Sequence, residues 1–380
     1  MNKINLKEQK PSDCLNSLYQ SNTASFDKLV FSIQSQTLKI NKSYEIIKNV
    51  DRQLCNVSEK YSGDISSIKL PDRAINRLTI LYGSHLCNFN CLYCYTKNMK
   101  DSPVDIAIYK QIINQLTSLN LQYTYWPGIG ELTLLPEFWK LMKYQAELHL
   151  PAVVFSNGSV FYDDDLATKY LNKNAGELFV IVDELPSLHL YIKMWSTNQD
   201  MACAMYGVSK RDYAYAKYKG VFVPLALKLL HERYGNRIGI QCLVTRDNFY
   251  DYTETILPFC IEEKIPLFAE PLILSGNAAK IDVEEKCLTK EQEDSVRHSF
   301  ASGELACRKR QYGEMILMSD AMTPGIALQP RKEDRIIDEN GKLRSLDRIY
   351  FSSYFRNARN ISDDIDGCFC RYLKQRDNAL

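Results

Sequence analysis

The chain has 380 residues, a formal net charge of +1 and 45% hydrophobic residues. That size and composition suit one large or two modest globular domains, and the near-neutral charge favours neither nucleic acid nor a membrane surface as a partner. The polar N-terminus, MNKINLKEQKPSDC, has no signal-peptide core, and no apolar run is long enough to span a bilayer. We therefore expect a cytoplasmic protein, whose twelve cysteines are better explained by metal binding than by disulfides.

The first 70 residues form a predicted N-terminal extension, rich in Ser, Asn, Gln and Lys. One amphipathic helix is predicted there from apolar residues at helical spacing: Ile46, Ile47, Val50, Leu54 and Val57. The segment contains no motif. An appended helix or small cap is favoured over a dedicated partner-docking segment.

From Arg77 onward, short apolar runs alternate with helical stretches. The predicted strands are Arg77–Tyr82, Gln122–Trp126, Pro151–Phe155, Leu188–Trp195, Arg237–Val244 and Ile265–Glu270. The predicted helices start at Ser102-Pro103 and near Pro136, and span Pro224–Tyr234 and Tyr250–Lys264, with extra structure inserted at Asn198–Val223. Because parallel neighbours need crossover helices, this pattern predicts a parallel sheet, and six repeats fit a partial (β/α)6 barrel over residues 71–280.

The most informative stretch is Cys87-Asn88-Phe89-Asn90-Cys91-Leu92-Tyr93-Cys94-Tyr95. Its C-x3-C-x2-C spacing places three thiolates on one loop, which can hold three irons of a cubane cluster and leave the fourth open. A zinc knuckle is the alternative, with His85 as the fourth ligand. The preceding strand and the aromatic Tyr93 favour the iron-sulfur interpretation.

The loop resembles the C-x3-C-x-aromatic-C signature of radical S-adenosylmethionine (radical SAM) enzymes, and the resemblance covers roughly Arg77 to Ala278. It implies a 4Fe-4S cluster on Cys87, Cys91 and Cys94, with S-adenosylmethionine bound to the open iron. It also implies that one electron, delivered by flavodoxin or ferredoxin, cleaves S-adenosylmethionine to a 5′-deoxyadenosyl radical. That radical abstracts a substrate hydrogen.

Weaker motifs follow the other predicted strands in the order that the family shows. Gly128-Ile129-Gly130-Glu131 resembles the Gly-Gly-Glu motif, Ser156-Asn157-Gly158 the Thr-Asn-Gly turn, and Ser275-Gly276-Asn277-Ala278 the Gly-x-Ala turn. The resemblance implies a set of residues that contact S-adenosylmethionine: Tyr93, Gly130, Glu131, Ser156, Asn157, Lys193, Ser196, Thr245 and Arg246. An ordinary turn or helix cap is the alternative at each motif.

Residues 281–380 are expected to form a separate α+β extension with four further cysteines: Cys287, Cys307, Cys368 and Cys370. Their spacing resembles the twitch extension of this family, a shortened SPASM domain that holds one auxiliary 4Fe-4S cluster. The position near Gly325 that carries a cysteine in full SPASM domains is not Cys here, which favours one auxiliary cluster over two. The alternatives are a surface thiol at Cys287 and zinc at the last two cysteines.

Other chemically interesting residues carry weaker signals. Core packing is expected for the cysteines without ligand-like spacing, which are Cys14, Cys55, Cys203, Cys242 and Cys260. The alternative for Cys203 is a hydrogen-atom donor to a substrate radical, as in some epimerases of the superfamily. The aromatic residues Tyr125, Trp126 and Trp195 lie near strand ends as candidate pocket residues, although core packing is commoner. No acid or base is assigned.

Twitch and SPASM relatives often modify peptides. The resemblance therefore implies a radical SAM maturase that oxidises or cross-links a ribosomal peptide. The alternative is a small-molecule dehydrogenase or epimerase, for example one acting on an aminoglycoside. A noncatalytic zinc protein is a third hypothesis, which metal content distinguishes from the first two.

Overall fold

A computed structural model of the chain describes residues 75–296 except 76, 98, 100–101, 104 and 120, and residues 299, 314–318, 321–323, 335–352 and 355–356. The predicted N-terminal extension and its helix lie outside the described residues, as do Cys14, Cys55, Cys307, Cys368 and Cys370. One large sheet organises the described part of the chain, with strand order β10-β9-β1-β2-β3-β4-β7-β8. Every pair of neighbours in it is parallel except β9 and β10.

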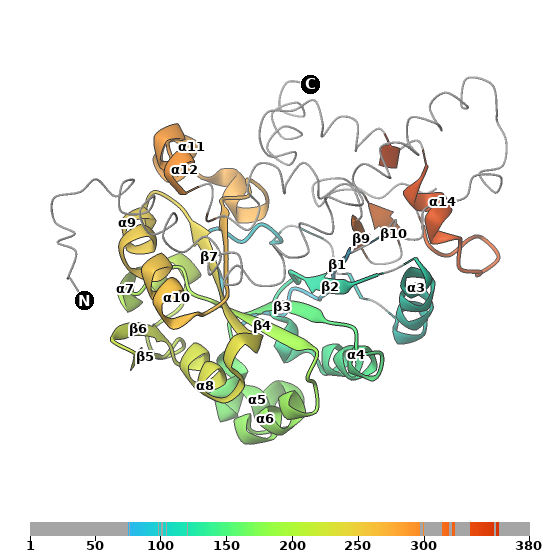
Figure 1. The fold of residues 1–380 in the computed structure, drawn as a ribbon, viewed down its shortest axis with the longest axis horizontal. Coiled ribbons are helices and arrows are strands. Elements are labelled where there is room, and N and C mark those ends of the chain that lie inside the picture. Colours follow the sequence, from blue (N-terminus) through green and yellow to red (C-terminus); the bar gives the residue numbers. More distant parts are fainter. Residues whose placement is uncertain are drawn as a thin grey trace.

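The six predicted strands are confirmed. They are β1 (Arg77–Leu81), β2 (Tyr123–Trp126), β3 (Ala152–Ser156), β4 (Leu188–Lys193), β7 (Ile238–Val244) and β8 (Leu267–Pro271). The crossover helices are α3 (Ile106–Ser118), α4 (Pro136–Glu147), α5 (Asp164–Leu171), α6 (Ala175–Asp183), α8 (Leu225–Tyr234) and α10 (Leu257–Glu263). They lie along the outer side of the curved sheet (Figure 1), so the fold is the expected partial α/β barrel.

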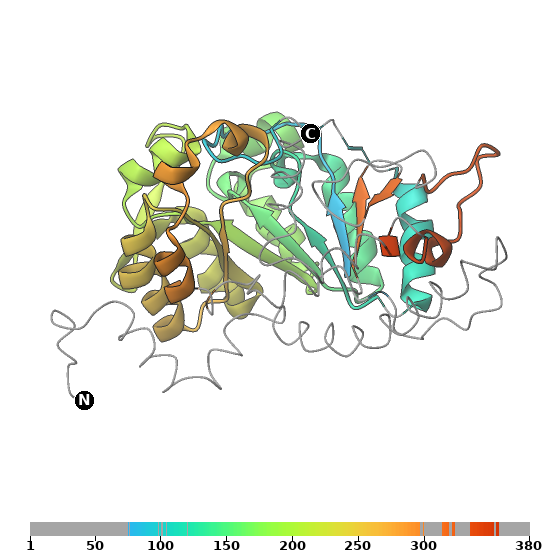
Figure 2. The ribbon, with the colours of Figure 1, turned by 90° about the horizontal axis from the view of Figure 1, so that it is seen from above.

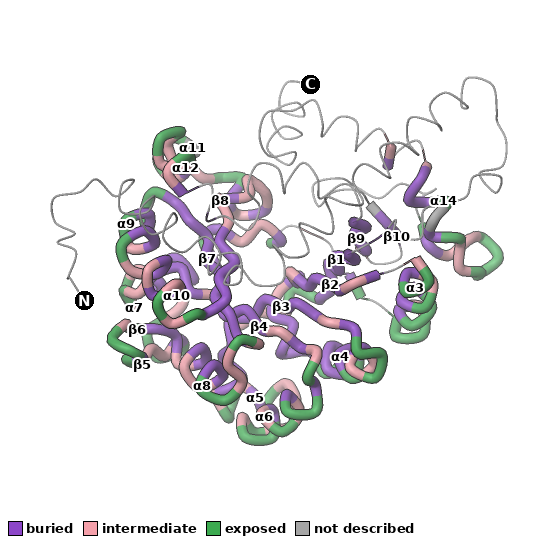
Figure 3. Tube along the Cα trace, viewed as in Figure 1, coloured by how far each residue is buried: buried purple, intermediate pink, exposed green. Residues whose placement is uncertain are grey.

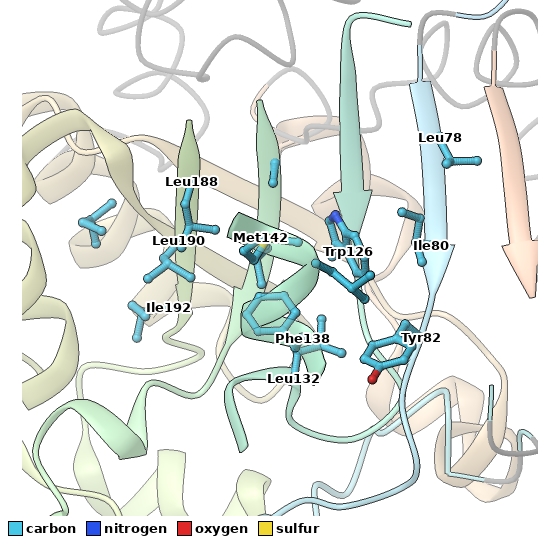
Figure 4. Close-up of a cluster of buried hydrophobic side chains, with 14 of the residues drawn as sticks. Leu78, Ile80, Tyr82, Trp126, Leu132, Phe138, Met142, Leu188, Leu190 and Ile192 are labelled. Carbon is cyan, nitrogen blue, oxygen red and sulfur yellow. The ribbon is translucent and has the colours of Figure 1, made fainter. Parts of the chain in front are cut away.

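The alternation of side chains along each strand divides the interior in two. Aliphatic residues of the outer face, such as Ile80 and Leu190, pack with Trp126 and Phe138 against the helices (Figure 4). The inner face carries a separate aromatic layer: Tyr123, Tyr125, Val153, Phe155, Tyr191 and Phe268. Figure 3 shows the strands as almost continuously buried, whereas the helices expose their outer turns. Burial on both faces explains why the strands read as apolar runs.

Helix α3 starts later than predicted. Asp105 caps it, because its Oδ1 accepts hydrogen bonds from the backbone N–H groups of Ala107 at 2.7 Å and Ile108 at 3.2 Å. Ser102, the predicted cap, instead exchanges two backbone hydrogen bonds with Gly83, at 2.9 and 3.2 Å. Because Ser102 pairs with Gly83, the helix begins only after Asp105.

The predicted insertion after β4 is confirmed as extra structure. It contains α7 (Gln199–Tyr206) and a hairpin of β5 (Tyr215–Tyr218) and β6 (Val221–Pro224). Between β7 and β8 the chain forms α9 (Phe249–Asp251), a π-helix (Tyr252–Ile256) and then α10. None of the helices in the described part of the chain is long and apolar enough to cross a membrane.

Part of the region expected to form a separate α+β extension joins the main sheet. After α11 (Val283–Lys286) and α12 (Lys290–Val296), β9 (Glu314–Met318) joins the main sheet parallel to β1, and β10 (Ala321–Thr323) pairs antiparallel with β9. Figure 2 shows these orange-red strands beside the blue β1. A last short helix, α14 (Leu346–Tyr350), packs near α3.

A buried ion pair fastens β9 to β1. The guanidinium of Arg77 pairs with Glu314, whose carboxylate also accepts a hydrogen bond from the Thr79 hydroxyl. Burial alone would lower the pKa of Arg77, but the charge of Glu314 outweighs it and raises that pKa. The guanidinium also lies 5.1 Å from the centroid of the Tyr125 ring. Glu314 is distant in sequence, which explains why strand patterns alone missed this strand.

The half-buried His189 on β4 predicts a loss of stability in mild acid. Burial, followed by the charge of Arg237, lowers its pKa to about 4. Because the unfolded chain has the ordinary pKa near 6.5, stability is complete above that pH and is lost as the pH falls towards 4, by about 2 kcal/mol at pH 5. Urea denaturation at pH 7.5 and 5.0 measures the difference. In the variant His189→Gln the free energy of unfolding should fall by about 2 kcal/mol less between pH 7.5 and 5.0 than in the wild type. An equal fall in both proteins would show that His189 is not the group responsible.

Candidate active site

A cavity of about 160 Å³ lies between the cysteine loop and the inner face of the sheet. Residues of the loop line one side: His85, Cys87, Phe89, Asn90, Cys91, Tyr93, Cys94, Tyr95, Thr96 and Lys97. The sheet and the turns after its strands supply the rest: Arg77, Tyr125, Pro127, Gly128, Gly130, Phe155, Lys193, Trp195, Gln241, Leu243, Glu270, Ile273, Glu314 and Ile316. The cavity therefore lies where the loops after parallel strands meet, the usual place for chemistry in such folds.

The three cysteines of the loop face this one cavity. Cys91 is 7% exposed, and Cys87 and Cys94 are half-buried. Burial raises the pKa of the Cys91 thiol to about 12 and also raises that of Cys87, although the positive charge of Lys193 opposes both shifts. A buried thiolate at this place therefore needs a cationic partner or a bound metal.

Lys193 supplies a positive charge at the end of β4. Burial by itself lowers the pKa of its ammonium, but the nearby Cys91 and Glu131 outweigh burial and raise it. The side chain is thus held charged, among the thiols and on the cavity wall. Such a buried cation can neutralise thiolates, or the carboxylate of a ligand.

Helix α7 supports the cysteine loop from one side. The backbone N–H groups of Asn90 and Leu92 donate to the carbonyls of Tyr206 at 3.0 Å and Met205 at 2.8 Å. The following Gly207 has φ +62°, and a Cβ there would lie 2.4 Å from the Asn90 carbonyl oxygen. Only glycine permits this approach without a shift of the backbone. The insertion, which had no assigned purpose in the sequence, is therefore a structural support of the site.

Two of the predicted motif turns support the loop from other sides. Asn157 donates from Nδ2 to Oδ1 of Asn88 at 2.8 Å. Asn277 donates from its backbone N–H to the Cys94 carbonyl at 2.8 Å and from Nδ2 to the Cys91 carbonyl at 3.0 Å. In Figure 2 the blue loop runs beside the orange segment after β8. The turns after β3 and β8 thus fix the loop that carries the thiols.

Glu131 lies beneath the loop and is 1% exposed. Its Oε1 accepts hydrogen bonds from the hydroxyls of Thr133 and Ser156, both at 2.7 Å, and its Oε2 accepts the backbone N–H of Asn157 at 2.7 Å. Its own backbone N–H donates to the Leu86 carbonyl at 2.7 Å. The carboxylate therefore joins β2, β3 and the cysteine loop into one buried network.

The predicted S-adenosylmethionine contacts fall into two groups. Tyr93, Gly130 and Lys193 line the cavity. The other six predicted contacts are not among its lining residues: Glu131, Ser156, Asn157, Ser196, Thr245 and Arg246. Within the second group, Ser196 donates to Asp251 at 2.6 Å and the Thr245 backbone N–H donates to Asn248 at 2.7 Å. Their direct roles stay predictions, and in the structure they support neighbouring turns.

The aromatic predictions divide in the same way. Tyr125 and Trp195 line the cavity, as expected. Trp126 does not, because alternation along β2 turns it to the outer face, where its Nε1 donates to Thr124 Oγ1 at 2.8 Å. Cys203 lies 6% exposed on α7 and is not among the cavity residues, so core packing describes it better than hydrogen-atom donation.

Four polar residues on the strands around the cavity were not predicted from the sequence: Arg77, Gln241, Glu270 and Glu314. Gln241 accepts from Trp195 Nε1 at 3.1 Å and donates to Glu270 at 3.3 Å. These residues could have been found as polar positions within otherwise apolar strands. A charged side chain on a buried strand is unfavourable unless it is paired or binds a ligand, so it indicates a site.

The three thiols of one loop, on the wall of one cavity beside a charged lysine, form a suitable donor set for an iron-sulfur cluster. Among the described residues, no three His, Cys, Asp or Glu side chains converge on the position of one metal ion. In a 4Fe-4S cluster each thiolate binds a different iron. The three thiols therefore need to line one cavity, but they need not converge on one point.

Comparisons with known proteins show partial similarity in sequence and a shared fold. No protein-family model matches the chain. Mycofactocin maturase MftC of Mycobacterium tuberculosis is 32% identical over 88 residues, 23% of this chain and 22% of that protein. MftC of Mycobacterium ulcerans is 26% identical over 102 residues, covering 26% and 27%. The chain thus matches only about a quarter of the length of these curated relatives.

Solved structures share the fold. Streptococcus suis SuiB bound to its precursor peptide SuiA has a TM-score of 0.51 and 16% identity, over 83% of this chain and 71% of that one. SuiB bound to S-adenosylmethionine has a TM-score of 0.52 and 16% identity, over 83% and 73%. Fold and site together define a partial α/β barrel with three thiols of one loop on the wall of its cavity. The chain is thus similar in fold to SuiB and, over about a quarter of its length, similar in sequence to MftC.

The Glu131 network predicts a large effect of a small substitution. In Glu131→Gln an NH₂ group replaces one carboxylate oxygen, so either the Asn157 N–H or the two hydroxyls lose their acceptor. We expect a loss of about 2–3 kcal/mol in the free energy of unfolding, measured by urea denaturation. The control is Glu147→Gln on the exposed end of α4. A loss below about 0.5 kcal/mol, as at ordinary surface sites, would contradict the network.

Proposed function

We propose that the chain is a radical SAM enzyme that reductively cleaves S-adenosylmethionine and abstracts a hydrogen from a ribosomally made peptide, which it oxidises or cross-links. The observation that carries this proposal is the grouping of Cys87, Cys91 and Cys94 on one cavity wall with the charged Lys193. The partial sequence similarity to MftC and the fold shared with SuiB support it.

The residues of the cavity have distinct proposed roles. Cys87, Cys91 and Cys94 would hold the cluster, and Tyr93 and Gly130 would shape the S-adenosylmethionine pocket beside it. When bound, the two cofactors supply a 5′-deoxyadenosyl radical after transfer of one electron. Lys193 would neutralise the negative charge of thiolates and of a ligand carboxylate, and the buried walls exclude water from the reacting hydrogen.

The inner part of the cavity is the proposed substrate site. Its walls combine the rings of Tyr125 and Phe155 with Leu243 and Ile316, while Gln241 provides a polar group. This mixture suits one side chain of a peptide, held by apolar contact and oriented by hydrogen bonds. A peptide substrate is supported by the names of the similar proteins, since MftC is a maturase and SuiB is bound to a precursor peptide.

The remaining parts of the proposal concern the rest of the chain. The proposed division is an N-terminal extension at 1–70, a radical SAM core at 71–280 and an auxiliary-cluster extension at 281–380. Cys287 is 7% exposed and packs in the same buried cluster as Cys91, while Cys307, Cys368 and Cys370 lie outside the described residues. An auxiliary 4Fe-4S cluster on these four, flavodoxin or ferredoxin as the electron donor and a cytoplasmic location complete the proposal.

The first test is Cys91→Ala. Anaerobically reconstituted protein should contain about eight irons per chain for two cubanes. The variant should lose about four of them, and it should form no methionine or 5′-deoxyadenosine with dithionite and S-adenosylmethionine. Iron analysis and chromatography of the products give the two readouts. Near-stoichiometric zinc in the wild type, or undiminished cleavage in the variant, would refute the proposal; Cys260→Ala, in the core, is the control.

The second test concerns the substrate. A small open reading frame beside the gene should encode a peptide that loses hydrogen when incubated with the reduced enzyme and S-adenosylmethionine. Mass spectrometry would show a decrease of about 2 Da for each oxidation or cross-link, because two hydrogens leave. Neighbouring glycosyltransferase or aminotransferase genes, with turnover of an amino sugar and none of the peptide, would favour the small-molecule alternative.

A further inference from the structure

Tyr93 connects the cavity to an ion pair outside it. The ring is 2% exposed, lines the cavity and lies 6.2 Å from the ring of Trp195, centroid to centroid. Its hydroxyl donates to Oδ2 of Asp247 at 2.7 Å. The phenol thus reaches from the cavity wall to a carboxylate in the loop after β7.

Asp247 is held at both oxygens. While Oδ2 accepts from Tyr93, Oδ1 accepts from Nζ of Lys286 at 3.1 Å. A backbone hydrogen bond reinforces this link, because the N–H of Arg246 donates to the Lys286 carbonyl at 3.0 Å. The orientation of the carboxylate is therefore fixed by two partners from different segments, the cysteine loop and the end of α11.

The place of Tyr93 in the sequence gives this contact its significance. It lies between Cys91 and Cys94, so a contact that holds its side chain also restrains the backbone between the two thiols. A buried tyrosine hydroxyl without a partner is unfavourable, and a charged acceptor makes a stronger and more directional bond than a neutral one. Packing against Trp195 involves only the ring of Tyr93. The hydrogen bond of the hydroxyl to Asp247 fixes how that ring is oriented in the cavity wall.

The same contact extends towards the C-terminal part of the chain. Lys286 precedes Cys287, which is 7% exposed and shares a buried cluster with Tyr93 and Cys91. Asn277 already binds the carbonyls of Cys91 and Cys94. The segment from 277 to 287 therefore holds the cysteine loop at two separate places, and Asp247 mediates the second.

We propose that Asp247 is a positioning residue: it fixes the Tyr93 ring in the cavity wall and, through Lys286, fastens the cysteine loop to the segment that leads into the C-terminal extension. The identity of the cavity's ligand as S-adenosylmethionine rests on the proposed function, but the mechanical link does not. Asp247 acts through Tyr93 and is not itself among the residues that line the cavity.

The test compares Asp247→Ala, Tyr93→Phe and the double variant. The surface control is Asp200→Asn, which removes an exposed ion pair with Lys210. In cluster-free protein, hydrogen–deuterium exchange of the 88–95 amides should accelerate about tenfold in each single variant. The double variant should exchange no faster than Asp247→Ala alone, because that substitution already removes the hydrogen bond that Tyr93→Phe deletes. The control should exchange at the wild-type rate, and the amides of β3 in the core should keep their wild-type protection in every variant.

A second readout uses the reconstituted protein. The dissociation constant for S-adenosylmethionine, measured by calorimetry, should rise about tenfold in both single variants, equivalent to about 1.4 kcal/mol. Exchange within about twofold of wild type, or effects that add in the double variant, would overturn the proposal. If wild-type protein neither binds nor cleaves S-adenosylmethionine, the proposed function fails, while the exchange data still decide the role of Asp247.

Discussion

The site depends on how the backbone of the cysteine loop is held. Five regions that are far apart in the sequence each contribute at least one hydrogen bond to it, through Glu131, Asn157, Tyr206, Asp247 and Asn277. A loop of this length has little structure of its own, and its conformational entropy must be overcome by contacts from outside. The thiols are positioned because the ends of several strands meet around them, and this follows from the parallel order of the sheet.

Charge is distributed around the cavity in compensated pairs. Lys193 lies near the thiols and Glu131, and Arg77 is paired with Glu314. Isolated charges in such an interior are unfavourable, whereas paired ones can be kept and can orient ligands. The aromatic layer borders the same cavity at Tyr125 and Phe155, and the guanidinium of Arg77 lies 5.1 Å from the centroid of the Tyr125 ring. The cavity therefore has charged groups both near the cysteines and at the Arg77–Glu314 pair, beside aromatic walls.

Two departures from expectation have the same origin. Strand β9 was assigned to a separate extension because its sequence neighbours show no β-α pattern, yet Glu314 meets Arg77 in the main sheet. The insertion that contains helix α7 was predicted without a role, yet the last carbonyls of α7 accept the N–H groups of Asn90 and Leu92. In both cases the deciding partner is remote in the chain, and local periodicity contains no information about it.

The sequence by itself determined the strands, the α/β class and the cysteine loop, because buried strands and thiol spacing are local properties. Family resemblance then placed the motif turns after the correct strands. Only the tertiary structure decided which motif residues face the cavity. Tyr93, Gly130 and Lys193 do, whereas Glu131 and Ser156 are used in a buried network. The direction in which a side chain points depends on the alternation along its strand and on hydrogen-bond partners that are remote in the sequence. These partners come together only when the sheet has assembled.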